Sequence, residues 1–337
     1  MTRLFHSWIG CLSLLACLSL TACGSKDELD IDQLERRLAQ NNESPHSPYF
    51  QNNPLPIGQG HLRILAIGNS FTIDALRYVS DILTNLGVDK ATYSLYGATH
   101  SSASLEHWCE QALQDSLVEL THWGGAKMDV EQGTMQELLA QSWDVVVLIQ
   151  KSEDAIHYET FNPWLHLLID HILQHCPNPN LTLAWEMSWS YNDTYVTTYS
   201  NYGRWLLIAL AAQTMTWNDG IDVVIPAGTA IQNARNTALN SESLLTRDGW
   251  HLNEGVGCYI AACTVVQSLF APVFGISILN DTMQIQIPHS PDTTHVYPLE
   301  PVTDENRPLC HQCVINAIEQ PFNITKQLVS GVQSTLP

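Results

Sequence analysis

The chain has 337 residues, and its 34 Asp and Glu against 14 Lys and Arg give a formal net charge of −20 at pH 7. Such an acidic chain is poorly suited to bind nucleic acid or a heavily sulfated glycan, because both polyanions require a basic surface. About 280 residues follow a polar N-terminal region, which is enough for one large α/β domain.

The N-terminus has the pattern of an export signal. Arg3 precedes an apolar stretch from Trp8 to Leu20 that is too short to span a membrane. The segment after it, Leu20-Thr21-Ala22-Cys23-Gly24, resembles the lipobox of bacterial lipoproteins, whose cysteine is lipidated and becomes the new N-terminus. We therefore expect a lipoprotein signal at residues 1–23, with Cys23 as the lipid attachment site. An ordinary signal peptide with a chance cysteine is the alternative.

Lipidation at Cys23 predicts an extracytoplasmic protein on a bacterial membrane, in the periplasm or at the cell surface, because several acyl chains anchor a protein without a spanning helix. Gly24 and Ser25 resemble the residues that direct such proteins to an outer membrane. No later stretch is predicted to cross a membrane. Residues 24–60 are polar and proline-containing, so we expect a flexible tether with one or two helical turns at most near Leu34 and Leu38.

Ser70 lies where a predicted strand becomes a predicted helix. The apolar run from Ile64 to Ile67 is typical of a strand covered on both faces, as in a parallel sheet. From Phe71 to Leu86 the apolar residues repeat with a helical period, and Gly87 can end that helix. The Ser70 hydroxyl would then lie beside the free N–H groups that begin a helix, a position that suits a nucleophile. A simple helix N-cap is the alternative.

Strands are also predicted at 91–96, ending at Gly97, and at 144–149, 181–185 and 222–226. An amphipathic helix is expected after Trp108, with Leu113, Leu117 and Leu120 on one face, and further helices at 163–175, at 205–212 and at 261–270. This alternation predicts parallel strands joined by right-handed crossovers. Ligands of such sheets bind at the carboxyl ends of the strands, where Ser70, Gly97 and Gln150 fall.

Asp248-Gly249-Trp250-His251 can supply the partners that a nucleophilic serine needs. A serine hydroxyl is hardly ionised at neutral pH, so it requires an imidazole to take its proton and a carboxylate to orient that imidazole. An Asp three residues before a His offers both from one loop. The Gly-x-Ser-x-Gly motif of the α/β-hydrolases is absent, because Phe71 and Thr72 follow the serine.

The pair of motifs Gly68-Asn69-Ser70-Phe71 and Asp248-Gly249-Trp250-His251-Leu252 resembles the SGNH/GDSL hydrolases, whose first motif carries the serine and whose last is Asp-x-x-His. More narrowly, the chain resembles a branch of secreted bacterial proteins described as a domain of unknown function. The supporting segments occur in the expected order at 66–71, 104–108, 143–150, 225–235 and 247–252.

The resemblance implies a catalytic triad of Ser70, Asp248 and His251. It also implies an oxyanion hole formed by the N–H of Ser70, a glycine N–H after the second strand and a side-chain amide after 144–149. Gly97 is the expected glycine, with Ser102 as the rival donor, because this chain has Ser102-Ala103 where the branch usually has two glycines. Gln150 stands where the superfamily has asparagine; its amide can donate in the same way, or it can serve only to bind the loop backbone.

Six cysteines lie after the lipobox, and outside the cytoplasm they can form disulfides: Cys109, Cys176, Cys258, Cys263, Cys310 and Cys313. Cys310-His311-Gln312-Cys313 is half a zinc site at best and lacks a thioredoxin-like context, so a local disulfide or free thiols are expected. His100, His107 and His122 are scattered along the chain. We therefore expect no metal and no cofactor.

Together these features predict an SGNH-like hydrolase domain at 61–275, built as a flavodoxin-like three-layer α/β/α sandwich with a central parallel sheet of about five strands. A C-terminal extension at 276–337 is expected to pack on it. The predicted function is a lipid-anchored serine esterase for acyl, chiefly O-acetyl, esters of a polysaccharide or a small molecule. Trp108, Trp185, Trp189 and Trp250 could stack on sugar rings, although core packing is the commoner function of tryptophan.

Two other classes of function stay open from the sequence. Gln150 and the Ser102-Ala103 loop, which depart from the family pattern, fit a surface glycan-binding lipoprotein with little or no catalysis. Cys310 and Cys313 would be the reactive pair of a thiol-disulfide protein.

Overall fold

The computed structural model describes residues 29–42, 55–58, 60–128, 130–195, 198–241, 245–286 and 297–325. The predicted signal peptide, with Cys23, lies outside the described residues.

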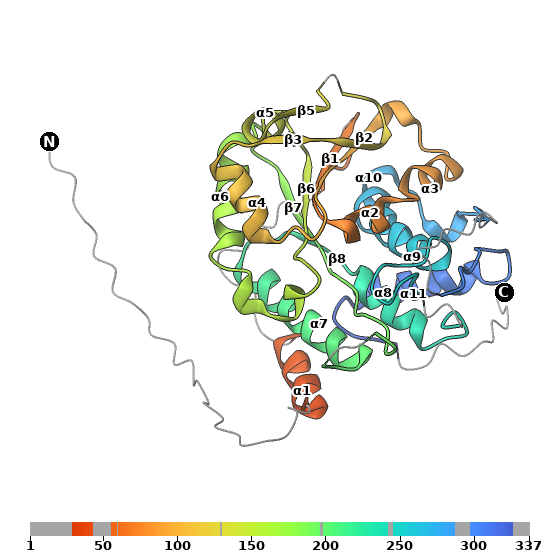
Figure 1. Ribbon diagram of the computed structural model, residues 1–337. Coiled ribbons are helices and arrows are strands. Elements are labelled where there is room, and N and C mark those ends of the chain that lie inside the picture. Colours follow the sequence, from red (N-terminus) through yellow and green to blue (C-terminus); the bar gives the residue numbers. More distant parts are fainter. Residues whose placement is uncertain are drawn as a thin grey trace, which may run out of the picture.

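A six-stranded sheet in the order β4-β2-β1-β6-β7-β8 forms the centre of the domain (Figure 1). Five strands are parallel: β1 (Leu62–Gly68), β2 (Tyr93–Thr99), β6 (Val145–Leu148), β7 (Thr182–Glu186) and β8 (Val223–Ile225). The edge strand β4 (Thr121–Gly125) pairs antiparallel to β2. The predicted α/β architecture is thus confirmed, with one antiparallel strand that the sequence pattern did not reveal.

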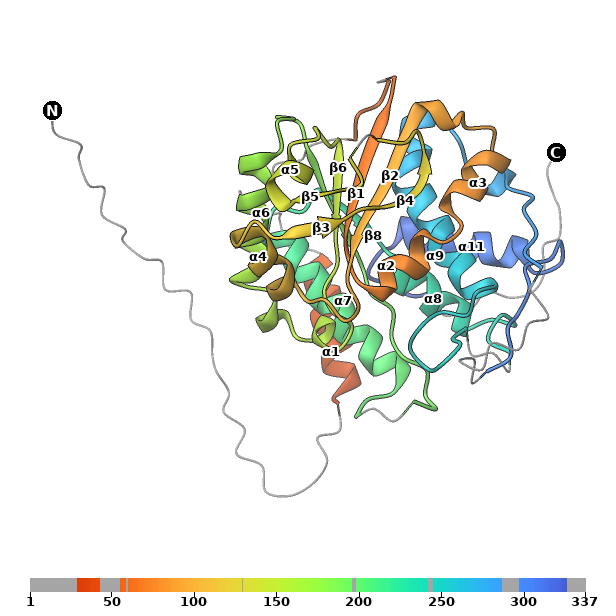
Figure 2. The same cartoon turned by 45° about the horizontal axis from the view of Figure 1, so that its top comes forward.

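Helices cover both faces of the sheet (Figure 2). One layer holds α2 (Ser70–Leu76), α3 (Val79–Asn85), α8 (Ala227–Arg235), α9 (Val256–Val265) and α11 (Arg307–Glu319). The other holds α4 (Leu105–Leu113), α5 (Met135–Leu139), α6 (Trp164–His175) and α7 (Asn201–Asn218). Successive side chains of a strand point to opposite faces, so Ile64 packs in the first layer and Leu65 in the second. This explains the unbroken apolar run of β1.

Two predicted helices differ from the structure. The helix expected from Phe71 to Leu86 is interrupted at Arg77-Tyr78 and forms α2 and α3. The helix after Trp108 ends at Leu113, and residues 117–119 form β3 (Leu117–Glu119), which pairs with β5 (Gln132–Thr134). Leu117 is 65% exposed, so its helical spacing from Leu113 does not reflect a buried helix face.

The predicted flexible tether contains a docked helix, α1 (Ile31–Asn42), which packs on α7. Leu34 and Leu38 are 8% and 5% exposed. The Tyr202 hydroxyl of α7 donates to the Glu35 carboxylate, and Gln213 Nε2 donates to the Leu38 carbonyl at 3.3 Å. The prediction of a flexible tether is therefore wrong for residues 31–42, where the expected one or two helical turns are part of a longer helix whose apolar side chains pack on a partner far along the chain.

The stretch Val256–Phe274 is long and apolar enough to cross a membrane, judged by length and composition alone. This differs from the prediction that no stretch after the N-terminal signal has these properties. Of its most apolar window, 83% is buried inside the domain, between the sheet and α11. Its hydrophobicity is therefore that of a central core helix.

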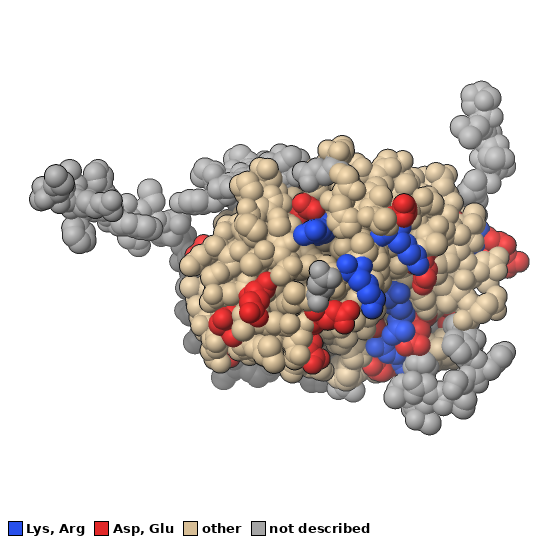
Figure 3. All heavy atoms as spheres, turned by 90° about the horizontal axis from the view of Figure 1, so that it is seen from above, with Lys and Arg blue, Asp and Glu red and all other residues tan. Residues whose placement is uncertain are grey.

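On the face of the domain where the parallel strands begin, Lys and Arg side chains lie beside Asp and Glu (Figure 3).

Candidate active site

Ser70 is the first residue of α2, and Asn69 is the residue that caps this helix. The Phe71 N–H donates to Asn69 Oδ1 at 3.0 Å, and Asn69 Nδ2 donates to the Ala103 carbonyl at 3.0 Å. Since the capping function belongs to Asn69, the Ser70 hydroxyl is available for another partner. That partner is His251, whose Nε2 lies 2.9 Å from Ser70 Oγ.

Asp248 completes the hydrogen-bonded chain, with its Oδ2 at 2.6 Å from His251 Nδ1. Asp248 Oδ1 accepts the backbone N–H groups of Trp250 at 3.1 Å and His251 at 2.8 Å. Burial alone would raise the pKa of Asp248, but the hydrogen bonds from His251 and from the two N–H groups outweigh it and hold this pKa below its ordinary value. Asp248 is thus ionised at neutral pH and suited to orient the imidazole.

The loop that carries Asp248 and His251 is attached to the helix that carries Ser70. Asp74, one turn after Ser70 and fully buried, accepts Arg247 Nη1 and the Leu252 N–H, both at 2.9 Å. Burial raises the pKa of Asp74, and the Arg247 charge opposes this shift. Asp74 has no function predicted from the sequence; its spacing of four residues from Ser70 is the signal that could have indicated one.

Aromatic residues support the same loop from the other side. Phe71 stacks on Trp189 with ring centroids 4.2 Å apart, and Trp189 Nε1 donates to the Trp250 carbonyl at 2.7 Å. Gly249 has φ +109, and a Cβ there would lie 2.9 Å from the Tyr195 ring. Glycine is therefore required at this turn, both for the backbone conformation and for the close approach of Tyr195. Trp108, Trp185 and Trp189 are all buried, so three of the four tryptophans considered as sugar platforms pack in the core.

Gly97 does not lie in the loop beside Ser70. It is inside β2, paired with Ala66 on one side and Thr121 on the other, because β2 continues to Thr99. A Cβ at Gly97 would come 2.8 Å from Trp123 Nε1, so packing of the indole accounts for the glycine.

The loop that does reach the serine is the turn from His100 to Ala103, closed by the Ala103 N–H to the His100 carbonyl at 3.1 Å. Ser101 and Ser102 line a pocket together with Ser70. Ser102 has φ +56, the left-handed conformation that favours glycine. Ser102, the alternative oxyanion donor predicted from the sequence, is therefore better placed than Gly97.

Gln150 follows β6 but its amide turns away from Ser70. Its Oε1 accepts the N–H groups of Leu105 at 3.0 Å and Lys151 at 2.8 Å, while Nε2 lies 3.3 Å from Thr160 Oγ1. The side chain is 1% exposed and does not line the pocket at the serine. Gln150 therefore fits the alternative reading, in which it holds the loops after β6 and before α4.

Glu186, at the end of β7, is an acid that the sequence analysis assigned only to the rim of the site. It is 1% exposed; Oε2 accepts the Thr72 hydroxyl at 3.4 Å, and Oε1 has no partner among the described residues. Burial raises the pKa of Glu186 to about 8, and the neighbouring Asp74 adds to this shift. A neutral carboxylic acid therefore lies beneath the helix of Ser70 at physiological pH.

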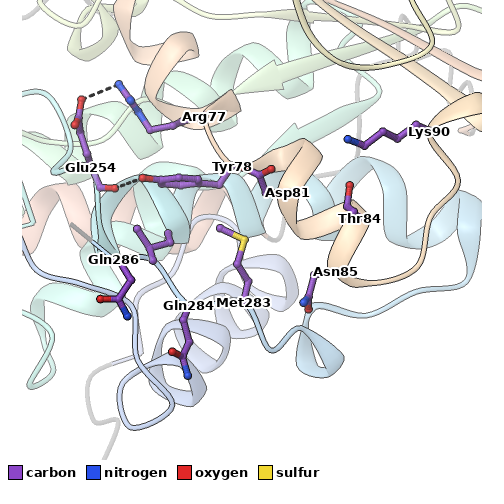
Figure 4. A pocket seen from close by; sticks show the side chains of 11 residues that line it. Arg77, Tyr78, Asp81, Thr84, Asn85, Lys90, Glu254, Met283, Gln284 and Gln286 are labelled. Carbon is purple, nitrogen blue, oxygen red and sulfur yellow. Dashed lines mark hydrogen bonds and ion pairs between the residues drawn. The ribbon is translucent and has the colours of Figure 1, made fainter. Parts of the chain in front are cut away.

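The pocket at the triad has a volume of about 170 Å³. Besides the loop serines it is lined by Lys151, Ser152, Glu153, Tyr191 and Trp250. A larger open hollow of about 630 Å³ lies between α3 and the segment 283–286, where Arg77 pairs with Glu254 at 3.0 Å (Figure 4). That hollow contains neither Ser70 nor His251, so the smaller pocket is the candidate active site.

The six cysteines among the described residues are all buried free thiols. Cys310 and Cys313 lie within α11, with thiol pKa values that burial raises, and therefore do not resemble a reactive dithiol.

Cys263, Asp281 and His311 form a buried cluster with ligand atoms within 4.8 Å of one another, which the sequence did not suggest. The Tyr259 hydroxyl donates to Asp281 and lies 2.8 Å from His311 Nε2, and it also interacts with the Cys263 thiol. Burial lowers the pKa of His311 to about 4. The three groups therefore converge on the Tyr259 hydroxyl, and this hydrogen-bonded structural network accounts for all of them.

The central sheet, covered by helices on both faces, and the hydrogen-bonded chain of Ser70, His251 and Asp248 at its carboxyl edge define an α/β/α protein with the side chains of a serine hydrolase triad. The chain belongs to the family described as a domain of unknown function, DUF4886, which matches residues 63–289. This confirms the predicted resemblance to a family described as a domain of unknown function.

The chain is similar to the crystal structure of a DUF4886 family protein from Bacteroides uniformis ATCC 8492, with a TM-score of 0.64 and 23% identity over 79% of this chain and 98% of that one. The two proteins share the fold. A crystal structure of an acetyl xylan esterase, AlAXEase, matches with a TM-score of 0.40 and 17% identity over 61% of this chain and 98% of that one. No curated protein matches the chain.

Proposed function

We propose that this protein is a serine esterase that hydrolyses short acyl esters, with Ser70 as the nucleophile. The observation that carries the proposal is the unbroken hydrogen-bonded chain from Ser70 Oγ through His251 to Asp248. In the first half of the reaction His251 takes the Ser70 proton while Oγ attacks the carbonyl carbon, and the same proton then passes to the leaving alcohol. Water, activated by His251, releases the acyl group from the serine in the second half.

The developing oxyanion would be held by backbone N–H groups. The N–H of Ser70 has no partner among the described residues, and Ser101 and Ser102 line the same pocket. We assign Ser102 in place of Gly97 as the second donor, and we assign no oxyanion contact to Gln150. Preorganised donors of this kind are commonly the largest single contribution to acyl-transfer rates.

The small pocket favours an acetyl or similarly short acyl group, because about 170 Å³ leaves little room beyond the reacting ester. Tyr191 and Trp250 on its wall are suited to stack on a sugar ring. An O-acetylated saccharide is therefore the substrate class that we propose, and Cys23 is the lipid anchor that we propose for the protein.

Replacement of Ser70 tests the mechanism. Ser70→Ala should lower the turnover of p-nitrophenyl acetate by at least three orders of magnitude, because the nucleophile is lost, while the circular dichroism spectrum stays the same. A fluorophosphonate probe should label the wild-type protein at Ser70 and leave the variant unlabelled. Ser80→Ala, a serine of α3 away from the pocket, is the matched control. Wild-type turnover in Ser70→Ala would exclude Ser70 as the nucleophile.

The amide of Gln150 contacts Thr160 and does not line the pocket at Ser70. This favours a second candidate function, that of a saccharide-binding lipoprotein that hydrolyses its ligand poorly. In that case the wild-type protein would resist the fluorophosphonate probe and still bind acetylated xylo-oligosaccharides in calorimetry. Labelling at Ser70 with turnover of the same oligosaccharides supports the esterase.

A further inference from the structure

The distance between the lipid attachment site and the first docked residue is short. Cys23 precedes Leu29, the first described residue, by six positions, and a peptide of that length reaches at most about 21 Å. A domain of this size has a diameter of about 50 Å. The connection is therefore too short to let an arbitrary face of the domain lie against the membrane.

The start of α1 is fixed beside the candidate active site. A Cβ on Gly203, in the first turn of α7, would lie 2.9 Å from Leu29 Cδ1 and 3.5 Å from Ile31 Cδ1, so these side chains pack directly on that turn. The Tyr202 hydroxyl, one residue earlier, donates to Glu35. Figures 1 and 2 both show α1 and α7 at the end of the domain opposite to the start of β1.

Arg204, the next residue of α7, connects this turn to the pocket. Its guanidinium donates to the Ser152 carbonyl and lies 3.8 Å from the centroid of the Tyr191 ring. Ser152 and Tyr191, whose hydroxyl oxygens are 2.9 Å apart, line the pocket that contains Ser70. One turn of α7 thus contacts the beginning of α1 on one side and the wall of the active-site pocket on the other.

We propose that the end of the domain formed by α1 and the first turn of α7 faces the lipid surface to which Cys23 is attached, and that the Ser70 pocket opens beside it and acts on acyl esters carried by membrane lipids. This inference rests on the proposed lipid anchor and, for the substrate, on the proposed esterase. The docking of α1 is essential to it: a free segment up to residue 60 would reach more than 100 Å and leave the orientation undefined.

Energy transfer from the protein to labelled lipids tests the orientation without requiring catalysis. The lipidated full chain is reconstituted in vesicles of phosphatidylethanolamine and phosphatidylglycerol that contain an acceptor headgroup. One donor is attached at Glu153→Cys on the pocket rim, where Glu153 is 59% exposed, and another at Lys127→Cys near the start of β2, where Lys127 is 72% exposed. The six native thiols after the lipobox are buried. The unsubstituted protein, treated with the same donor reagent, measures the background labelling of these thiols.

We expect clearly higher transfer from position 153 than from position 127. Equal transfer, or higher transfer from position 127, overturns the inference while leaving the esterase proposal intact. Failure of the full chain to stay with the vesicles overturns it as well.

Lengthening the connection tests the consequence for substrates. A 20-residue Gly/Ser segment inserted after Ser25 should equalise transfer from the two positions and lower the hydrolysis of an acetylated glycolipid in the same vesicles several-fold, with unchanged turnover of soluble p-nitrophenyl acetate. The matched control is the same segment inserted after Glu43, behind the docked helix, which should change neither measurement. Equal effects of both insertions, or no effect of the first, contradict the proposed orientation, and a protein inactive on the soluble ester instead refutes the esterase proposal.

Discussion

At the scale of the residue, the reactive position of Ser70 depends on what its neighbours do. Asn69 takes over the capping of α2, and His251 is held by Asp248 and stacks edge-on to Phe71 with ring centroids 5.9 Å apart. Asp248 in turn is fixed by the N–H groups of its own loop. Ser70, His251 and Asp248 therefore each have one side-chain orientation that satisfies their hydrogen bonds, as a proton-transfer site requires.

Glu186→Gln should stabilise the protein increasingly as the pH rises. The pKa of this carboxyl is about 8 in the folded protein, whereas its ordinary value, taken for the unfolded chain, is 4.5. Between these two pH values the native state retains a proton that the unfolded chain has lost. Its stability contribution is thus complete below pH 4.5 and is lost as the pH rises to about 8, on the order of 1.4 kcal/mol per unit of pKa difference. Glutamine does not titrate.

Thermal unfolding at pH 5 and at pH 8.5 measures the effect of Glu186→Gln, with Glu106→Gln, an exposed acid of α4, as the control. The gain in Tm over the wild type should be small at pH 5 and large at pH 8.5. A gain that is the same at both values would show that Glu186 is already ionised in the folded protein.

Ser102→Gly should raise the free energy of unfolding by about 1 kcal/mol, because a left-handed backbone is costly for serine and free of strain for glycine. Urea denaturation measures the change. Ser101→Gly, the preceding residue of the same turn without a positive φ, is the matched control and should destabilise slightly. Equal effects at the two positions would contradict the strain at Ser102.

At the scale of the element, α2 couples the two halves of the triad. The helix presents Ser70 at its first residue and Asp74 one turn later, and Asp74 binds both Arg247 and the N–H of Leu252 on either side of the Asp248 loop. Because both contacts start from one short helix, the hydroxyl and the imidazole keep their separation even though 181 positions divide them in the chain.

Asp74→Asn should therefore affect stability and catalysis together. Loss of the carboxylate leaves the Arg247 charge unpaired in a largely buried place, at a cost of about 3 kcal/mol in the free energy of unfolding. The turnover of p-nitrophenyl acetate should fall as well, because His251 loses its support. Urea denaturation and steady-state kinetics measure the two effects, and Asp81→Asn, an exposed acid of α3, should alter neither. A variant with lower stability but full turnover would show that the ion pair between Asp74 and Arg247 does not support the active site.

At the scale of the whole molecule, α1 and α11 add segments from both ends of the chain to the central α/β unit. α1 packs on α7, and α11 packs on α8 and α9, so the two additions lie on opposite layers of the sheet. The domain thus extends past the boundaries at 61 and 275 that the sequence pattern predicts.

Leu38→Ala should loosen α1 without unfolding the domain, because Leu38 is 5% exposed and belongs to the peripheral helix α1, which packs on α7. Removal of such a buried side chain costs about 2–3 kcal/mol. Hydrogen exchange should become faster at the α1 amides and stay unchanged in β1 and β6. Gln40→Ala, an exposed position of the same helix, is the control. Unchanged exchange in α1 would mean that the helix is held by other contacts.

The sequence by itself determined the features that depend on local pattern or on residue chemistry. The apolar runs of β1 and β6 specify buried strands because both faces of a central strand are covered, and the Ser70, Asp248 and His251 side chains were recognisable because few residue types can activate a serine. Tertiary structure decided the rest. Whether Gly97 or Ser102 faces the serine depends on where β2 ends, and the contact of Gln150 with Thr160 depends on loop packing. Leu117 in an edge strand and Leu38 on a docked helix have partners far away in the chain, so no local periodicity could reveal them.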